Sequence, residues 1–539
     1  MLPICKGGVS MWVEPNGKVI LLSGVPVDPT QTDVPWFASA GAQESFFKGF
    51  TLKSYSKVSF MRVNTSVPQS AQGNTGSPRT ASTIRVPTNA AELYTANYLM
   101  FQNTSYSNKW FYAFVETVNP LSDNATEISY QIDDMQTWQF DFTVGACPLK
   151  REHIDVGHDV IGANVEPEPF TCNKITAFEK VITALPKLCA LVTTNGEGTE
   201  AAEPYQNGGF VAGCAVKILN ASTTAIKAFI DEYVAAKNMS AIITVYSYLD
   251  PVANTITLPL DSLRFVGVGS VGWSGGALKN KKIFTSQFIN YVVTGVDGEL
   301  HEYDPEGFGE VDGAISINPS SYPWLKVLDP QNYYALSTDA RIAQVSHRKG
   351  ISLGITIPFG GTSWATDLDV AVSKGMLKVA AAALTGGSAG GFLGGMSHGF
   401  AAGLRSEGEI LATNANPMRS QGVGGDYSAI QGAEFVSGTT GLSGIHYGVN
   451  AIPASMAKEI DQFFTYYGYA TNDVKVPNGV RHPDPLSRSV FNYVQTDGCI
   501  FSASSCPADS ASNIKKIFDK GVRLWHDTSK IGTVVTDNS

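Results

Sequence analysis

The sequence has few charged residues and no excess of basic ones. Charged side chains make up 16% of its 539 residues, against about 25% in typical soluble domains. The 38 basic residues are outnumbered by 48 acidic ones, giving a formal net charge of −10 at pH 7. A protein that grips nucleic acid through its phosphates needs a basic surface. The composition therefore argues against tight DNA binding, and is compatible with an acidic wall along which DNA slides.

Several sequence signatures of chemistry are also missing. Seven cysteines are too few, and odd in number, for a disulfide framework, and no pair has C-x-x-C spacing. The eight histidines form no zinc pattern, and there is no Walker A sequence. The first residues lack the uninterrupted apolar stretch and the cleavage site of a secretory signal. We therefore predict no metal, no cofactor, no nucleotide hydrolysis and folding in a cytoplasm.

The abundant residues favour strands over long helices. Hydrophobic residues make up 43% of the chain, which holds 53 Gly, 27 Pro, 21 Tyr and 27 Phe. Aromatic residues prefer strands, and Gly and Pro favour tight turns. The length suggests three or four domains. We expect a mainly β fold with some α structure.

Residue periodicity locates the first elements. Residues 57–63, 109–118 and 128–142 alternate in the manner of strands, and residues 64–87 form a polar loop or an insertion in a hairpin. Apolar residues at helical spacing predict helices over 222–237, 456–467 and 512–525, with a strand over 490–496. Asp297 and Gly298 form a favoured hairpin turn. We assign the aromatic residues of the early strands to core and subunit packing: Trp110, Phe111, Tyr112, Phe114, Trp138 and Phe140.

One segment differs from the rest of the chain. Residues 379–404 run for 26 positions without Asp, Glu, Lys or Arg, and eight are Gly and seven Ala. Five glycines recur at a spacing of four, which on a helix gives a bare stripe that allows close helix packing: Gly387, Gly391, Gly395, Gly399 and Gly403. A helix of this length could span a bilayer.

Three interpretations of this segment stay open. A transmembrane anchor is disfavoured because Gly and Ala are weakly attracted to lipid, and eight glycines cost roughly 1 kcal/mol each in a helix. A buried core helix is the second interpretation. The third, which we prefer, is a flexible apolar loop that is shielded inside an assembly and enters a membrane later, since an exposed apolar segment would aggregate.

Two glycine motifs match enzyme patterns by spacing. Gly267, Gly269 and Gly272 satisfy G-x-G-x-x-G, but the following residues are poor helix material and no acidic residue stands twenty positions on. Residues 272–276 satisfy G-x-S-x-G with Ser274 as nucleophile, and Asp297, His301 and His347 follow downstream. Both matches are more simply explained by a glycine-rich turn between strands.

The other polar clusters of the sequence do not show the spacing of a metal or catalytic site. His153 and His158 stand five residues apart and are better explained as a polar edge or a subunit contact than as metal ligands. The acidic stretch 297–312 is expected to be a solvated loop, with a calcium site as a weak alternative. Arg341, Arg348 and Lys349 form a small basic face.

Several multi-residue matches, in order along the chain, resemble one family. They are Trp36-Phe37, residues 98–115 (YLMFQNTSYSNKWFYAFV), 132–140 (IDDMQTWQF), 151–153 (REH), 463–469 (FFTYYGY), 491–496 (FNYVQT) with Cys499, and 517–526 (IFDKGVRLWH). These segments resemble the distal tail-tube, or tail-knob, proteins of small short-tailed phages with protein-primed DNA replication. The family also has a Gly/Ala-rich apolar loop before the C-terminal piece, which residues 379–404 match in kind and place.

The resemblance implies an assembly and a set of partners. Family members form a homohexamer, a hollow cylinder of β-barrel-like tube domains that closes the end of the tail. The expected partners are other tail proteins (the proximal tube and collar), genomic DNA passing through the lumen without sequence-specific binding, and the host membrane. The expected location is the phage tail tip, after assembly in the bacterial cytoplasm.

The resemblance also implies a division of the chain. Residues 1–156 would form an N-terminal β-rich tube domain and 157–350 inserted domains that lengthen the tube. Residues 351–375 would be return strands, 376–411 the apolar loop, and 412–539 a C-terminal segment that completes the tube domain. This chain departs from the family in its middle domains.

We therefore predict a structural protein, not an enzyme, that forms a DNA-ejection conduit. The apolar loop would plug the lumen and then penetrate the host membrane. Its membrane-active residues would be Met376, Leu377, Leu384, Phe392, Leu393, Met396, Phe400 and Leu404. The alternative is a receptor-binding or cell-wall-degrading tail component, in the latter case a serine hydrolase around Ser274.

Overall fold

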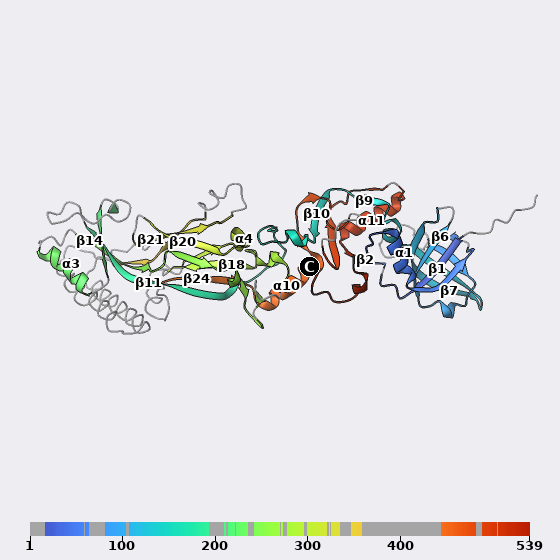
Figure 1. The fold of residues 1–539 in the computed structure, drawn as a ribbon, viewed down its shortest axis with the longest axis horizontal. Helices are drawn as coiled ribbons and strands as arrows, with labels where there is room; N and C mark the ends of the chain where they lie inside the picture. The colour runs from blue at the N-terminus through green and yellow to red at the C-terminus, as the bar shows by residue number, and fades with distance from the viewer. Residues whose placement is uncertain are drawn as a thin grey trace, which may run out of the picture. The chain divides into compact units, whose positions relative to one another are not determined.

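The computed structural model contains two compact units, each described here by itself. The first comprises Met1–Asp159, Glu166–Glu168 and Ile460–Ser539, and the second Val160–Val165 and Pro169–Glu459. The fold is mainly β with few helices, as the sequence predicts (Figure 1). The structure describes residues 17–27, 29–58, 60–63, 81–103, 107–192, 210–211, 214–220, 223–235, 242–269, 271–272, 278–295, 299–320, 323, 325–334, 347–357, 444–480, 488–503 and 505–538.

A seven-stranded antiparallel sheet dominates the N-terminal part of the first unit. Its order is β3-β1-β6-β7-β8-β5-β4. The strands are β1 (Gly17–Ser23), β3 (Thr51–Ser56), β4 (Phe60–Val63), β5 (Ala81–Val86), β6 (Ala96–Asn103), β7 (Trp110–Ser122) and β8 (Ala125–Ile132). On β1, β6 and the start of β7, buried apolar residues occupy both alternating sets of positions, so both faces of these strands are covered. On β6, Tyr98 packs with Phe47 of helix α1 (Ala40–Lys48), whereas Leu99 packs with Val19 on the other face.

The early strand predictions are confirmed at β4 and β7. Tyr112 and Phe114 of β7 are buried, and Trp110 and Phe111 pack against the core, which confirms their assignment to packing. The expected loop 64–87 is shorter than predicted, because β5 occupies its last part and pairs with β4. These two strands are the arms of a hairpin, which fits the insertion that the sequence allowed.

The strand predicted over residues 128–142 is wrong in its second half. Strand β8 ends at Ile132, and residues Asp134–Trp138 form the short helix α2. The side chain of Asp133 caps this helix by accepting a hydrogen bond from the Gln136 backbone N–H at 3.0 Å. An N-cap aspartate satisfies a free donor of the first turn and favours helix over strand. Trp138 lies in the core as expected.

A second sheet of the first unit joins the two ends of the chain. Its order is β2-β29-β27-β10-β25, and β26 also pairs with β10. The strands are β2 (Asp33–Pro35), β10 (Cys147–Glu152), β25 (Tyr469–Ala470), β26 (Val474–Lys475), β27 (Phe491–Thr496) and β29 (Val522–Trp525). Asp33 accepts from the Arg523 guanidinium at 2.6 and 2.8 Å and from the Trp525 indole at 2.7 Å. N-terminal and C-terminal residues therefore share one hydrogen-bonded sheet.

The predicted helix over 512–525 ends earlier than expected. Helix α11 spans Ala508–Lys520, and Val522–Trp525 is strand β29. Gly521 separates them with φ at +99°, a conformation that side-chain-bearing residues rarely adopt. The predicted strand over 490–496 is confirmed as β27, and the helix over 456–467 as α10 (Ala454–Tyr467).

The second unit is built around an eight-stranded and a four-stranded sheet. The larger has the path β12-β13-β11-β24-β18-β19, with β14 pairing to β11 and β23, and the smaller has the order β15-β20-β21-β22. The long strand β11 (Ile175–Val192) runs beside β24 (Gly444–Ala451), which pairs with β18 (Ile289–Thr294) and then β19 (Leu300–Tyr303) (Figure 1). The remaining strands are β12 (Phe210–Val211), β13 (Cys214–Asn220), β14 (Ile242–Pro251), β15 (Thr255–Leu258), β20 (Gly313–Pro319), β21 (Leu325–Gln331), β22 (Lys349–Ser352) and β23 (Gly354–Ile357).

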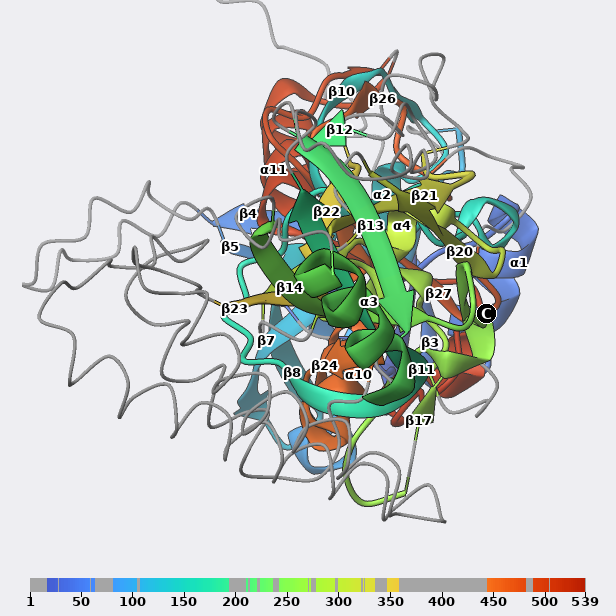
Figure 2. The same ribbon diagram turned by 90° about the vertical axis from the view of Figure 1, so that its left-hand side faces the viewer.

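The second unit contains one predicted helix, one predicted hairpin and the acidic stretch 297–312. Helix α3 (Thr223–Ala235) confirms the helix predicted over 222–237 and packs against β13 (Figure 2). Strands β18 and β19 pair antiparallel on either side of the predicted hairpin turn at Asp297-Gly298, which lies outside the described residues. The acidic stretch is not simply a solvated loop, because it contains β19 and the short helix α4 (Pro305–Phe308).

Candidate functional site: a buried polar network at the chain crossings

The motif of glycines 267, 269 and 272 belongs to a turn between two strands, as the sequence analysis predicts. Strands β16 (Arg264–Phe265) and β17 (Val271–Gly272) pair antiparallel around it. A nucleophile elbow requires a strand, a sharp turn and a helix, whereas the strand before Ser274 is one arm of a hairpin. Ser274 itself lies outside the described residues, as does Asp297. The two histidines that follow also have other surroundings: His301 is buried on β19, and the His347 ring packs against Tyr333 at 4.8 Å.

The apolar segment also lies outside the described residues. This holds for its predicted membrane-active residues, Met376, Leu377, Leu384, Phe392, Leu393, Met396, Phe400 and Leu404, and for the packing glycines Gly387, Gly391, Gly395, Gly399 and Gly403. Among the helices that are described, none is both long and apolar enough to cross a bilayer. The described residues likewise contain no group of three or more potential metal ligands.

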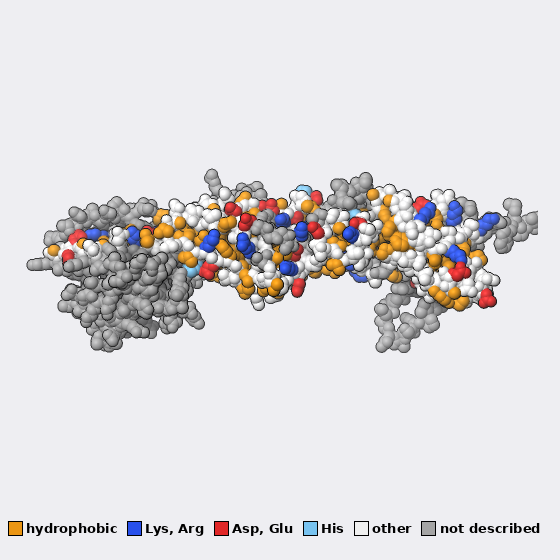
Figure 3. Space-filling view, turned by 60° about the horizontal axis from the view of Figure 1, so that its bottom comes forward, with side chains coloured by type: hydrophobic (Ala, Val, Ile, Leu, Met, Phe, Trp, Pro, Cys, Tyr) orange, Lys and Arg blue, Asp and Glu red, His pale blue; other side chains and the backbone are white. Residues whose placement is uncertain are grey.

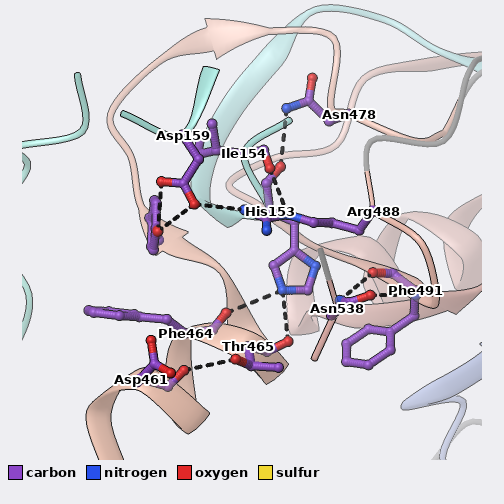
Figure 4. A network of polar contacts seen from close by, with 11 residues as sticks. His153, Ile154, Asp159, Asp461, Phe464, Thr465, Asn478, Arg488, Phe491 and Asn538 are labelled. Atoms are coloured by element: carbon purple, nitrogen blue, oxygen red, sulfur yellow. Dashed lines mark hydrogen bonds and ion pairs between the residues drawn. The ribbon is translucent and has the colours of Figure 1, made fainter. Parts of the chain in front are cut away.

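The most concentrated buried polar chemistry lies where the chain leaves and returns to the first unit. The chain departs after Asp159, contributes Glu166–Glu168, and returns at Ile460. We call the polar groups around these points the crossing network; Lys475 is partly exposed and the other members are buried: Arg151, Glu152, His153, Asp159, Glu168, Tyr469, Lys475 and Arg488. All belong to the first unit, and Figure 4 shows His153, Asp159 and Arg488 among them.

Arg151 and Glu168 fasten the departing chain to the sheet. Their side chains form a direct ion pair, and both residues are buried. Arg151 also donates to the Gly468 carbonyl at 2.7 Å, and Glu168 accepts from the Ala470 backbone N–H at 2.7 Å. This geometry follows from the pairing of β10 with β25, which places Arg151 opposite Ala470.

Asp159 is the second fastening of the departing chain. The Tyr469 hydroxyl donates to its two oxygens at 2.8 and 2.9 Å, and Arg488 approaches it at 3.2 Å. Arg488 also donates through Nε to the Ile154 carbonyl at 2.8 Å. The Asp159 carboxylate therefore links the departing segment to two residues of the returning one.

Glu152 is fully buried at the end of β10. Lys475 forms an ion pair with it at 2.6 Å, and the Asn478 backbone N–H donates to it at 3.1 Å. Burial raises the pKa of this carboxyl, and the contact with Lys475 opposes that shift. The packing here is close, because a Cβ on Gly468 would lie 2.1 Å from the Glu152 carbonyl oxygen. Gly468 also has φ at +63°, so the position requires glycine.

His153 contacts helix α10 and Asn478, which donates to the His153 carbonyl at 3.1 Å (Figure 4), and it also contacts strand β27. Its Nδ1 accepts a hydrogen bond from the Tyr493 backbone N–H at 2.9 Å. Its Nε2 lies 3.1 and 3.3 Å from the carbonyls of Thr465 and Phe464, so the proton of the neutral ring is on Nε2. Burial, and then the positive charge of Arg488, lower the pKa of His153 to about 3. The predicted role of His153 as a polar edge is therefore wrong, whereas His158 is exposed, 3.4 Å from Asp155.

The contacts of the network stabilise the folded first unit and do not form a catalytic arrangement. Each buried charge meets an opposite charge and hydrogen-bond partners, and both ring nitrogens of His153 are occupied by backbone groups. Removing one partner of a buried ion pair leaves an uncompensated charge, which typically costs about 3–5 kcal/mol. Sequence reasoning used residues 151–153 only as part of a resemblance. The network's partners lie as far as 329 positions apart, and no local pattern marks them.

The described residues on the face shown in Figure 3 form no concentrated patch of one charge. On the face shown in Figure 3, acidic and basic side chains alternate with uncharged and hydrophobic ones over the described residues. No extended basic band is visible on that face, in line with the acidic balance of the chain.

Comparison with known proteins gives consistent matches. A family model for the caudoviral major tail protein N-terminus matches residues 15–143, and a model for the C-terminal domain of the Bacillus phage phi29 tail knob protein gp9 matches residues 332–539. The tail knob protein of Bacillus phage B103 is 32% identical over 150 residues, which are 28% of this chain. The tail knob protein of phi29 is 32% identical over 143 residues, 26% of this chain. These two alignments span only 22% of the length of each relative.

Two further matches cover nearly the whole chain. The tail knob protein of Bacillus phage PZA is 22% identical, and the alignment covers 97% of this chain and 98% of the relative. The solved structure of the bacteriophage C1 tail knob protein gp12 has a TM-score of 0.55 at 14% identity, covering 96% of this chain and 99% of that one. The latter shows a shared fold. The curated relatives are named as tail knob proteins, which are structural components, so the prediction that the chain is not an enzyme is confirmed.

Proposed function

This chain is a relative of the phage tail knob proteins, and from that premise we propose that it forms a homohexameric hollow cylinder at the tip of a phage tail. The cylinder conducts DNA out of the virion, and its apolar loops open a path through the host membrane. One observation carries the proposal: the sequence of one tail knob protein and the fold of another each align with more than nine-tenths of the chain.

The construction of the first unit supports a mechanical role in the tail. Its second sheet contains residues from both ends of the chain, and the second unit lies between them in the sequence, interrupted only by Glu166–Glu168. The crossing network fastens the chain on both sides of that segment through two buried ion pairs and a third in which Lys475 is partly exposed. A tube through which DNA passes under pressure requires such firm attachment of its inserted segments. We propose that residues 157–350 lengthen the tube and that residues 412–539 complete the domain begun by residues 1–156.

The charge of the chain supports a conduit rather than a DNA-binding site. Its formal net charge is −10, and phosphates are repelled by acidic surfaces. DNA would therefore pass through the lumen without sequence-specific contacts. The cylinder would attach to proximal tail proteins at the virion end, after assembly in the bacterial cytoplasm.

The membrane step is assigned to residues 376–411. Because 26 residues in a row carry no charge, the free-energy cost of inserting this segment into lipid is low. The glycine stripe would let neighbouring copies pack closely. Before ejection the loops would plug the lumen, where copies shield one another from water.

A liposome experiment tests this assignment. We expect the full-length protein to release a trapped dye from liposomes, and a variant lacking residues 379–404 to form intact rings without releasing dye. A double substitution, Phe392→Asp with Leu393→Asp, should also abolish release because two charges enter the apolar run, each costing about 2.5–3.5 kcal/mol in a bilayer. The matched control His398→Ala should release dye normally. Undiminished release by the deletion variant would refute the assignment.

A further inference from the structure

Three side chains of the second unit form a constellation that the proposed function does not use. Lys174 lies just before β11, Asn290 on β18 and Glu302 on β19. The Lys174 ammonium group is in direct contact with the Asn290 amide oxygen Oδ1. The Asn290 amide nitrogen donates to the Glu302 carboxylate at 3.4 Å. A lysine, an asparagine and a carboxylate are thus connected through one amide group.

Strand register explains why these residues meet. Asn290 pairs with Asn450 on β24, which pairs with Thr176 on β11, so all three lie on one face of the sheet. Lys174 stands two residues before Thr176 and extends along the same face. Glu302 pairs with Val292, two residues after Asn290, and shares that face as well. Strands β11, β24 and β18 are labelled near one another in Figure 1 and pair in that order, and β19 pairs with β18.

The surroundings hold the lysine and the amide in place. Lys174 also donates to the Ser286 carbonyl at 2.5 Å, and Ser286 is itself fixed by the Glu306 carboxylate, which accepts from its backbone N–H at 2.8 Å. Asn290 is only 3% exposed, so few water molecules compete for its amide carbon. Since the C=O bond is about 1.23 Å long, an amine in contact with Oδ1 also lies close to Cγ.

We propose that Lys174 and Asn290 form an intramolecular isopeptide bond, with Glu302 as the proton-transfer group. Glu302 accepts a proton from the Lys174 ammonium, and the resulting neutral amine attacks Cγ of Asn290. A bond forms between Nζ and Cγ, and the bond from Cγ to the amide nitrogen breaks. The protonated Glu302 gives its proton to the leaving nitrogen, which departs as ammonia, and the regenerated carboxylate takes the second proton from Nζ and passes it to solvent. The reaction is a transamidation that requires no oxidant and no other reactant.

Proximity is what makes such a reaction feasible. Well-oriented intramolecular reactions reach effective concentrations of about 10⁵–10⁸ M, which compensates for the poor reactivity of an amide. Glu302 touches the nitrogen that must leave, which is where a proton is needed. The bond would close a loop between positions that are 116 residues apart and would tie the entry of β11 to β18.

The mass of the intact full-length protein tests the proposal directly. The expected mass is lower than that of the sequence by one molecule of ammonia. Tryptic digestion followed by tandem mass spectrometry should give a branched peptide in which Lys174 is joined to Asn290. An unmodified mass, together with separate linear peptides for the two residues, would overturn the proposal.

Variants separate the chemistry from the fold. Lys174→Arg and Asn290→Ala should each restore the full sequence mass. Glu302→Gln keeps both reacting groups and should also restore it, or slow the bond by a large factor, because no proton acceptor remains. Full cross-linking in Glu302→Gln would refute the role of the carboxylate.

The chain supplies its own control pair. The Lys187 ammonium donates to the Asn220 side-chain oxygen at 2.6 Å, but this pair is exposed to solvent. We expect no branched peptide there, and Lys187→Arg should leave the ammonia deficit unchanged. A branched peptide at Lys187 equal in yield to that at Lys174 would show non-specific condensation and overturn the proposal.

Discussion

Two buried titratable side chains of the first unit respond to pH in opposite directions. His153 is held neutral, because burial and Arg488 lower its pKa to about 3. An unfolded histidine has a pKa near 6.5, so below that value the unfolded chain takes up a proton that the folded chain does not. This contribution to stability is complete above about pH 6.5 and is lost as the pH falls toward 3.

Asp133 behaves in the opposite way. Burial raises its pKa to about 6, despite hydrogen bonds from Gln136 and Tyr98 that favour the ionised form. The folded chain therefore binds more protons than the unfolded chain between about pH 4 and pH 6. Its contribution to stability grows as the pH falls through this range. The wild-type pH profile thus combines two opposed effects, and a substitution is needed to separate them.

At the residue scale we predict the effect of replacing His153. The free energy of unfolding of the His153→Gln variant should not show the part of the pH dependence that comes from His153. The stability advantage of the wild type over this variant should shrink by about 2 kcal/mol between pH 7 and pH 5. Chemical unfolding at both pH values measures it. His158→Gln, at an exposed histidine five residues away, should keep the wild-type profile. An unchanged advantage of the wild type over His153→Gln at both pH values would contradict the account.

At the scale of elements, short polar caps decide where strands give way to helices. Asp133 caps α2 and also receives hydrogen bonds from the Tyr98 hydroxyl at 2.8 Å and the Gln31 amide at 3.0 Å. A single carboxylate therefore both starts a helix and connects it to the neighbouring sheet. Gly521 has the corresponding role at the end of α11, where a positive φ allows β29 to begin.

We predict that Asp133→Ala destabilises the first unit by about 2–4 kcal/mol, since it removes an N-cap and leaves the buried Tyr98 hydroxyl unpaired. Thermal or chemical unfolding measures the loss. Ser39→Ala provides the matched control, because Ser39 caps the exposed start of α1 through the Ala42 N–H at 3.2 Å. That variant should lose only about 1 kcal/mol. Equal losses in the two variants would show that the Tyr98 contact contributes nothing.

Periodicity predicted the elements that depend on local sequence. The alternating residues of β7 and the helical spacing in α3 and α10 led to correct assignments, because burial of one face follows from such patterns. The strand prediction over residues 128–142 was wrong in its second half. It followed the strand preference of aromatic and β-branched residues and did not recognise Asp133 as the N-cap of a helix. The predicted helix over 512–525 likewise extended beyond Gly521, at which α11 ends.

The crossing network could not be predicted in the same way. Arg151 meets Glu168 and the Gly468 carbonyl only after β10 and β25 pair, and Asp159 meets Arg488 only after the chain returns. Such contacts depend on long-range register, which a single sequence does not reveal. The apolar segment 379–404, in contrast, stands out in the sequence through its lack of charge alone.

At the scale of the whole molecule, the chain folds as a unit built from both of its ends with a second unit inserted between them. The ion pair of Asp33 with Arg523 spans 490 positions and brings the ends into one sheet. In a ring, copies of such a subunit would cover the sheet edges of their neighbours and so remove sites of uncontrolled strand pairing. The proposed cylinder and the membrane step both depend on this ring.

Negative-stain electron microscopy of the purified full-length protein, analysed as two-dimensional class averages, tests the ring most directly. We expect hollow rings with sixfold symmetry. Monodisperse monomers at micromolar concentration, or rings of another symmetry, would contradict the proposed hexameric conduit.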